Sequence, residues 1–183
     1  MKKIFVMLMC LISMFSLVAC APDTSSNTFP EVSWIGEENA DFLNSNWGDT
    51  LEQVKEENNS LNFAEEPGII GALANVDGYK SNVLFEFDEE NKLFKCFAGS
   101  YFTVDDERLN EFYMIKDKLT ELYGAPTRDE EIWYNNENEN NPDKLIESIL
   151  LKHVIFNVVW EIDDTNIVLY LDSEGSFVAF EKA

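Results

Sequence analysis

The sequence predicts an α+β domain, with one or two antiparallel sheets and helices on one face. Three observations support this class. Alternating apolar residues flank Asp77-Gly78, apolar residues recur at spacings of three and four between Asp105 and Tyr123, and three strand-like segments end the chain. We expect a single domain over residues 47–183, without a second folded unit.

The first predicted element is a short helix that starts after Thr50. Thr50 and Gln53 have the spacing of a capping box, and Leu51 and Val54 share one helical face. Strands 69–76 and 79–88 follow, joined by Asp77-Gly78, a strong hairpin signal. In the second of these strands Val83, Phe85 and Phe87 should point inward and Glu86 outward, and a third strand covers 93–101.

The longest predicted helix covers residues 105–123 and ends at Gly124 and Pro126. A short strand at 132–134 and a polar loop at 135–141 come next. Asn141 and Pro142 are typical of a helix start, and Leu145, Ile146, Ile149 and Leu150 form an apolar stripe up to Leu151. Strands 154–162, 166–171 and 176–181 complete the prediction.

Residues 82–91 align without gaps on residues 157–166, and five of the ten positions are identical. Strand-turn-strand sequences also match by chance. Because both segments come late in a helix-then-strands series, the match favours a duplication, with repeats at 47–103 and 104–183.

The first residues have the layout of an export signal. Lys2 and Lys3 precede an apolar run that is short for a bilayer span, and Leu17-Val18-Ala19-Cys20 resembles the bacterial lipobox. The resemblance implies a signal peptide at 1–19 and a diacylglyceryl group on Cys20. Residues 20–46 would then form a tether, with Trp34 and Ile35 docked on the domain.

The chain has 35 acidic and 13 basic residues, a formal net charge of −22. This charge argues against nucleic acid and against a basic membrane-binding patch, so membrane attachment should come from the lipid on Cys20. The predicted location is the extracytoplasmic face of the cell membrane, or the outer membrane where an envelope has two. The acidity serves solubility or attracts a cationic partner.

The sequence has few residues of the types that bind metals or cofactors or carry out catalysis. With one histidine and Cys96 the only thiol outside the segment up to Cys20, the common zinc and copper ligand sets are missing, and we expect a buried Cys96. The best calcium ligands would be Glu137, Glu139 and Asp143, but no calcium-loop pattern supports them. No cofactor and no catalytic residue are predicted.

An enzyme remains the alternative, a hydrolase or another envelope enzyme that uses acidic residues near His153. No nucleophile elbow or phosphate-binding loop accompanies that histidine.

Trp133 and Tyr134 are adjacent on a predicted strand and must face opposite ways, so one of them should be exposed. Together with Glu137 and Glu139 in the following loop, they are the predicted partner-binding residues.

The order of elements resembles that of β-lactamase inhibitor protein and of the small lipoproteins of outer-membrane barrel assembly. The resemblance is carried by residues 47–54, which open the first helix, and by residues 123–126, which close the second. It implies a sheet whose uncovered face or loops contact a partner protein. We therefore expect a lipid-anchored, non-catalytic module that binds a protein or peptide.

Overall fold

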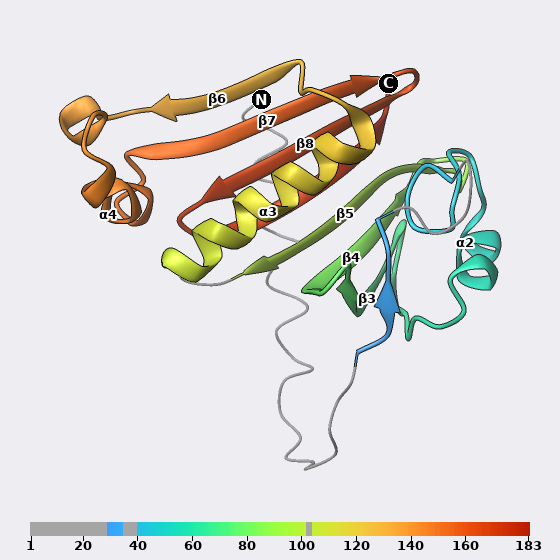
Figure 1. Cartoon of the computed structure of the whole chain (residues 1–183). Helices are drawn as coiled ribbons and strands as arrows, with labels where there is room; N and C mark the ends of the chain where they lie inside the picture. The colour runs from blue at the N-terminus through green and yellow to red at the C-terminus, as the bar shows by residue number, and fades with distance from the viewer. Residues whose placement is uncertain (1–28, 35–39, 102–103) are drawn as a thin grey trace, which may run out of the picture.

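The computed structural model describes residues 29–34, 40–101 and 104–183 (Figure 1). The predicted signal peptide, Cys20 and residues 21–28 lie outside the described residues. The described chain is an α+β fold built on a nine-stranded, mostly antiparallel sheet, which confirms the predicted class.

The first half of the chain supplies one helix and five strands: β1 (Glu31–Val32), α2 (Leu51–Glu57), β2 (Ala64–Glu66), β3 (Ile69–Val76), β4 (Tyr79–Phe87) and β5 (Leu93–Tyr101). The predicted capping box is present, with Thr50 accepting from the backbone N–H of Gln53 and the Gln53 side chain accepting from that of Thr50. Asp77 and Gly78 both have positive φ, at 48° and 92°, as the two-residue hairpin turn requires.

The second half supplies α3 (Asp106–Tyr123), β6 (Arg128–Trp133), α4 (Leu145–Leu150), β7 (Val154–Ile162), β8 (Thr165–Asp172) and β9 (Gly175–Lys182). Asp105 caps α3 by accepting from the N–H of Arg108, and Gly124 ends the helix at φ 83°. β6 begins four residues before the predicted strand, because an exposed edge strand tolerates the charged run from Arg128 to Glu131.

The order of strands is nearly symmetric about the centre of the sheet, where β5 pairs with β9. β3, β4, β5, β9, β8, β7 and β6 are neighbours in that order, and β2 pairs with β3 as β6 pairs with β7. The order of elements is thus a helix and four strands, twice. In this arrangement the counterpart of β4 is β8, whereas the sequence match aligns β4 with β7. The aligned segments are not equivalent strands, so the duplication hypothesis rests on element order alone.

One face of the sheet carries the core. Alternate residues of the central strands are fully buried there, among them Phe85, Cys96, Phe180 and Trp160. Buried residues of all three helices join the same cluster, and α3 crosses this face in Figure 1. Phe112 of α3 packs edge-on against Phe156 of β7, with ring centroids 5.4 Å apart.

The folded part already includes residues upstream of Trp47, in the segment that was predicted to be a tether. β1 pairs in parallel with β3, and Trp34, Phe42 and Leu43 are each at most 1% exposed. The Trp34 and Phe42 rings pack against Phe180, with centroids 6.2 and 4.9 Å away. Residues 29–34 and 40–46 are therefore part of the domain, and the docking expected of Trp34 is confirmed. Ile35, which was expected to dock with it, lies outside the described residues.

Gly99 lies where the two halves of the sheet meet, on β5 opposite Phe177 of β9. A Cβ at Gly99 would lie 2.5 Å from the Phe177 Cβ and 2.7 Å from the Ser176 carbonyl oxygen. Because these atoms cannot rotate away, we expect Gly99→Ala to lower the free energy of unfolding by about 1–3 kcal/mol, measured by urea denaturation.

The control for Gly99→Ala is Asn82→Ala, at the position that faces Gly99 on β4. This change removes atoms and should have the smaller effect. Equal stability of Gly99→Ala and wild type would contradict the close approach of β5 and β9.

Candidate partner-binding surface

The connection between β6 and β7, residues 134–153, departs most from the tandem pattern. Its counterpart between β2 and β3 is only Pro67-Gly68, whereas this connection contains two 3₁₀ turns (Asn136–Asn138 and Pro142–Lys144) and α4. In Figure 1 it forms the left end of the molecule. An insertion at one end of a regular sheet is a natural place for binding residues.

Side-chain caps shape the first part of the connection. The Asn135 side chain accepts from the N–H of Glu137 at 3.1 Å and starts the first turn. Asn141 makes no such bond before Pro142, and the α-helix begins only at Leu145. The helix predicted up to Leu151 is therefore a 3₁₀ turn followed by a shorter α-helix.

The connection is held from its inner side. Ile149 is fully buried in the core, and the carbonyl of buried Ser148 accepts from the N–H of His153 at 2.8 Å. The His153 carbonyl in turn accepts from the N–H of Tyr134 at 2.7 Å. These contacts fix both ends of the connection against each other.

The connection exposes three large apolar side chains among residues that are mostly polar. Tyr134 is 68% exposed, Leu151 55% and Leu150 41%, which makes three of the seven large exposed apolar side chains among the described residues. We call these three residues the connection patch. Trp133 instead packs against the core and donates from Nε1 to Glu131 at 3.1 Å. Of the two adjacent aromatic residues, Tyr134 is thus the exposed one.

The connection also carries charged residues, one of which pairs with Glu174 outside it. Glu137 and Glu139 are exposed, Lys144 pairs with Glu147 at 2.5 Å, and Lys152 pairs with Glu174 at 3.1 Å. Within the described part of the chain, no three acidic, histidine or cysteine side chains form a group that could hold a metal ion. Glu137, Glu139 and Asp143 therefore do not come together as calcium ligands.

His153 and Cys96 are both at least partly enclosed by the fold. The His153 Nδ1 is buried and has no hydrogen-bond partner among the described residues. Cys96 is fully buried, and this burial holds the pKa of its thiol well above its usual range, so a thiolate is disfavoured.

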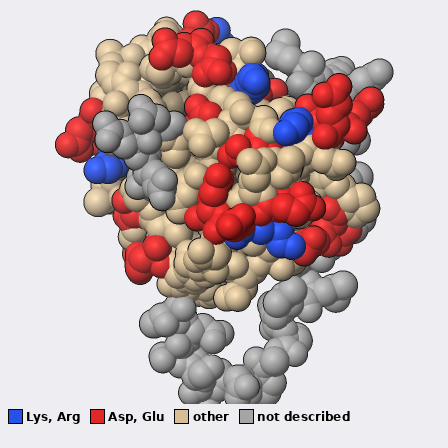
Figure 2. All heavy atoms as spheres, turned by 90° about the vertical axis from the view of Figure 1, so that its right-hand side faces the viewer, with Lys and Arg blue, Asp and Glu red and all other residues tan. Residues whose placement is uncertain are grey.

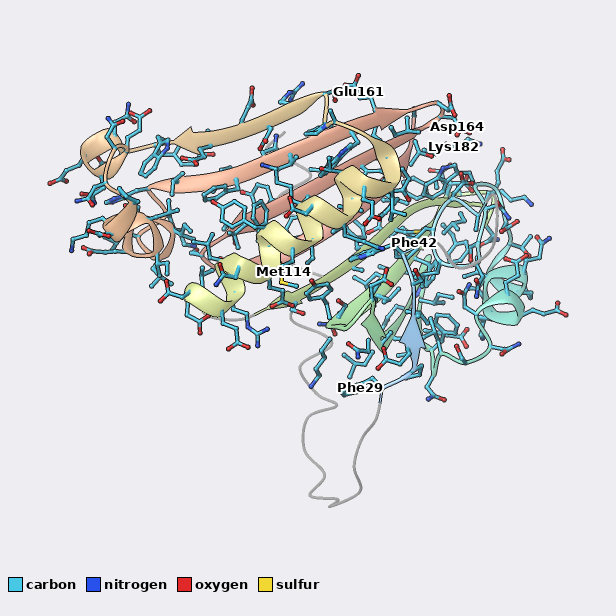
Figure 3. All side chains as sticks on the ribbon, in the orientation of Figure 1. Phe29, Phe42, Met114, Glu161, Asp164 and Lys182 are labelled. Atoms are coloured by element: carbon cyan, nitrogen blue, oxygen red, sulfur yellow. The ribbon has the colours of Figure 1, made fainter. Side chains whose placement is uncertain are left out.

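A separate hollow of about 200 Å³ lies at the far end of the sheet, and His153 does not line it. Its wall includes Asp41, Asp164 and Tyr123. Burial raises the pKa of the Asp41 carboxyl, and it raises the pKa of Tyr123 to about 12. Asp164 lies beside Lys182 there (Figure 3). No local sequence pattern indicates this hollow, because its residues are distant in the chain.

Acidic side chains dominate the side of the molecule where α2 lies. Figure 2 shows this side, with few lysine and arginine side chains between the carboxylates. Carboxylates are therefore found on this side of the molecule as well as on the connection.

Near the connection, the pKa of Asp172 is raised, chiefly by burial. A raised pKa in the folded state means that the protonated carboxyl stabilises the fold below the unfolded value of 3.8, and that this contribution is lost as pH rises through the folded value. Asp172→Asn keeps an oxygen that can accept from the N–H of Glu174. We expect this variant to unfold at higher urea concentration than wild type at pH 7, and at a similar one near pH 3.

Glu137→Gln, at an exposed position of the connection, is the control for Asp172→Asn and should show a smaller difference at pH 7. An Asp172→Asn variant less stable than wild type at pH 7 would contradict the role assigned to burial.

Comparison with known proteins does not identify a family for this chain. No family model and no curated protein matches the chain. Among solved structures, the chain matches the crystal structure of a DUF4309 family protein (YjgB) from Bacillus subtilis subsp. subtilis str. 168. It is 10% identical, and the alignment covers 74% of this chain and 79% of that one with a TM-score of 0.39.

Proposed function

We propose that this protein is a lipid-anchored, non-catalytic module that binds a protein or peptide at the extracytoplasmic face of a membrane. The observation that carries the binding role is the connection patch, in which three large apolar side chains are exposed on an inserted segment. Exposed apolar side chains within a polar rim mark interaction surfaces.

The other face of the sheet is a weaker candidate for the binding surface. Its central cross-strand row includes Phe97 and Ala179, which are each only 9% exposed. Among the described strand residues of this face, only Leu73 is a large exposed apolar side chain, at 41%, whereas the connection exposes three. The connection patch therefore supports the proposal better than the sheet face.

The anchor proposal rests on Leu17-Val18-Ala19-Cys20. No helix in the described ranges is both long and apolar enough to span a bilayer. Because the described part of the domain starts at Phe29, a fully extended tether of residues 21–28 would hold that part within about 28 Å of the lipid. This tether is much shorter than the one expected over residues 20–46, so the partner should also lie close to the membrane.

A pull-down from detergent-solubilised membranes tests the binding role. We expect the protein to retain a specific partner, and we expect the triple variant Tyr134→Ser, Leu150→Ser and Leu151→Ser to lose at least nine-tenths of it. Exposed apolar anchors contribute most of the free energy at such surfaces. Met114→Ser is the control, because Met114 is 60% exposed on α3, away from the connection (Figure 3).

Capture of the same partner by wild type and triple variant would show that the connection patch is not the binding surface. Absence of any specific partner at several salt concentrations would contradict the binding role itself.

A further inference from the structure

The two edges of the sheet are built differently. At one edge, β3 is covered by β1 and β2, which both pair with it. At the other edge, β6 pairs with β7 along six residues, and no described strand pairs with its outer side. In Figure 1 this outer side forms the upper margin of the sheet. An uncovered edge strand offers a row of backbone donors and acceptors to an added strand.

The register shows which backbone groups point outward. Tyr134 donates its N–H to the His153 carbonyl across the β6–β7 pair. Because hydrogen-bonding direction alternates along an antiparallel strand, Asp129, Glu131 and Trp133 direct their N–H and C=O groups away from β7. These three residues form the free edge.

The acidic side chains of the free edge indicate which kind of added strand it would accept. Asp129, Glu130 and Glu131 are consecutive and exposed. Lys116 pairs with Asp129 at 2.6 Å, but none of the ion pairs among described residues includes Glu130 or Glu131. A second copy of the chain, added antiparallel, would place carboxylates opposite carboxylates, which is destabilising. A strand that carries lysine or arginine would place opposite charges there.

The free edge also leads into the connection patch. β6 ends at Trp133, and the next residue, Tyr134, is the most exposed large apolar side chain among the described residues. An added strand that runs along β6 would therefore reach Tyr134, and its own apolar residues could pack there. In strand addition, backbone hydrogen bonds give affinity and contacts to alternate side chains of the added strand give specificity.

We propose that β6 accepts an extended segment of the partner protein as an added strand, and that this segment carries lysine or arginine residues. This inference rests on the proposed binding function and names the chemistry of the partner.

The test uses a ten-residue peptide of alternating lysine and valine, with the glutamate-for-lysine peptide as its control. We expect the lysine peptide to bind and to slow amide hydrogen exchange at Asp129, Glu131 and Trp133 of the wild-type protein at least tenfold. The glutamate peptide should change nothing. No binding of the lysine peptide at millimolar concentration, or binding without slower exchange at these three amides, would overturn the inference.

Two substitutions separate backbone pairing from charge. Both Glu131→Pro and Glu131→Ala remove the carboxylate, which also accepts from Trp133 Nε1. Glu131→Pro removes in addition one outward N–H, without removing a β6–β7 hydrogen bond. We expect Glu131→Pro to weaken binding of the lysine peptide at least tenfold and Glu131→Ala about threefold. Equal effects of the two variants would overturn strand addition. The amide hydrogen-exchange test uses the wild-type protein, so it remains decisive even if Glu131→Pro does not fold.

The same variants distinguish this inference from the proposed function. If Glu131→Pro still captures the membrane partner while the triple variant does not, the binding module stands and strand addition fails. If wild type captures no partner, the proposed function fails first.

Discussion

Replacing Cys20 with alanine is expected to release the protein from the membrane fraction almost completely. The proposed diacylglyceryl group is the only anchor that the sequence suggests, and two acyl chains are sufficient for stable attachment. The charge of −22 gives the protein no electrostatic attraction to anionic lipids once the chains are lost. Fractionation of cells and the intact mass of the purified protein measure the effect.

Cys10→Ala is the matched control, since it changes a cysteine within the proposed signal peptide but outside the lipobox. It should leave both the lipid adduct and the membrane location unchanged. A wild-type mass without a lipid adduct, or a Cys20→Ala variant that stays in the membrane fraction, would contradict the anchor.

Phe180→Ala is expected to lower the free energy of unfolding by about 3–5 kcal/mol. Phe180 is fully buried on β9 at the middle of the sheet. Its ring contacts Trp34 and Phe42 of the N-terminal segment, and Tyr123 of α3 with centroids 6.3 Å apart. One side chain therefore joins three parts of the fold. A loss of this size is a large fraction of the stability of a typical domain.

Phe177→Ala provides the comparison for Phe180. Phe177 lies on the opposite face of β9, is half-buried and stacks on Tyr170 with centroids 5.1 Å apart. Phe177→Ala should lower the free energy of unfolding by about 1–2 kcal/mol, because less apolar surface is lost from the interior. Urea denaturation of both variants measures the difference. A smaller cost for Phe180→Ala than for Phe177→Ala would contradict the central position of Phe180.

Elements with strong local signals could be predicted from the sequence. The Asp77-Gly78 hairpin and α3 follow from turn chemistry, helical spacing and caps, all of which act within a few residues. The N-terminal strand β1 could not be predicted in this way. It is two residues long, and its structure comes from parallel pairing with β3, more than forty positions later in the chain.

The candidate surface was predictable in part. Alternation along a strand requires Trp133 and Tyr134 to face opposite ways, and the exposure of Tyr134 follows once Trp133 packs inward. Leu150 and Leu151 were expected in the buried stripe of a helix. They are exposed because α4 ends at Leu150 and presents only its inner side, with Ile149, to the core.

The free edge of β6 shows a further limit of sequence reasoning. Arg128, Asp129, Glu130 and Glu131 have no strand-like alternation, so the strand was expected to begin only at Ile132. Pairing with β7 imposes the extended conformation, and exposure makes the charged side chains tolerable.

Photo-crosslinking in intact cells tests the central claim most directly. A photoreactive phenylalanine analogue at position 134 should capture one dominant membrane-associated protein, and the same analogue at position 114 should not. Capture should also require Cys20, because loss of the proposed anchor removes the protein from its partner. Equal labelling from positions 134 and 114, or labelling that persists fully in the Cys20→Ala variant, would contradict a membrane-anchored module that binds through the β6–β7 connection.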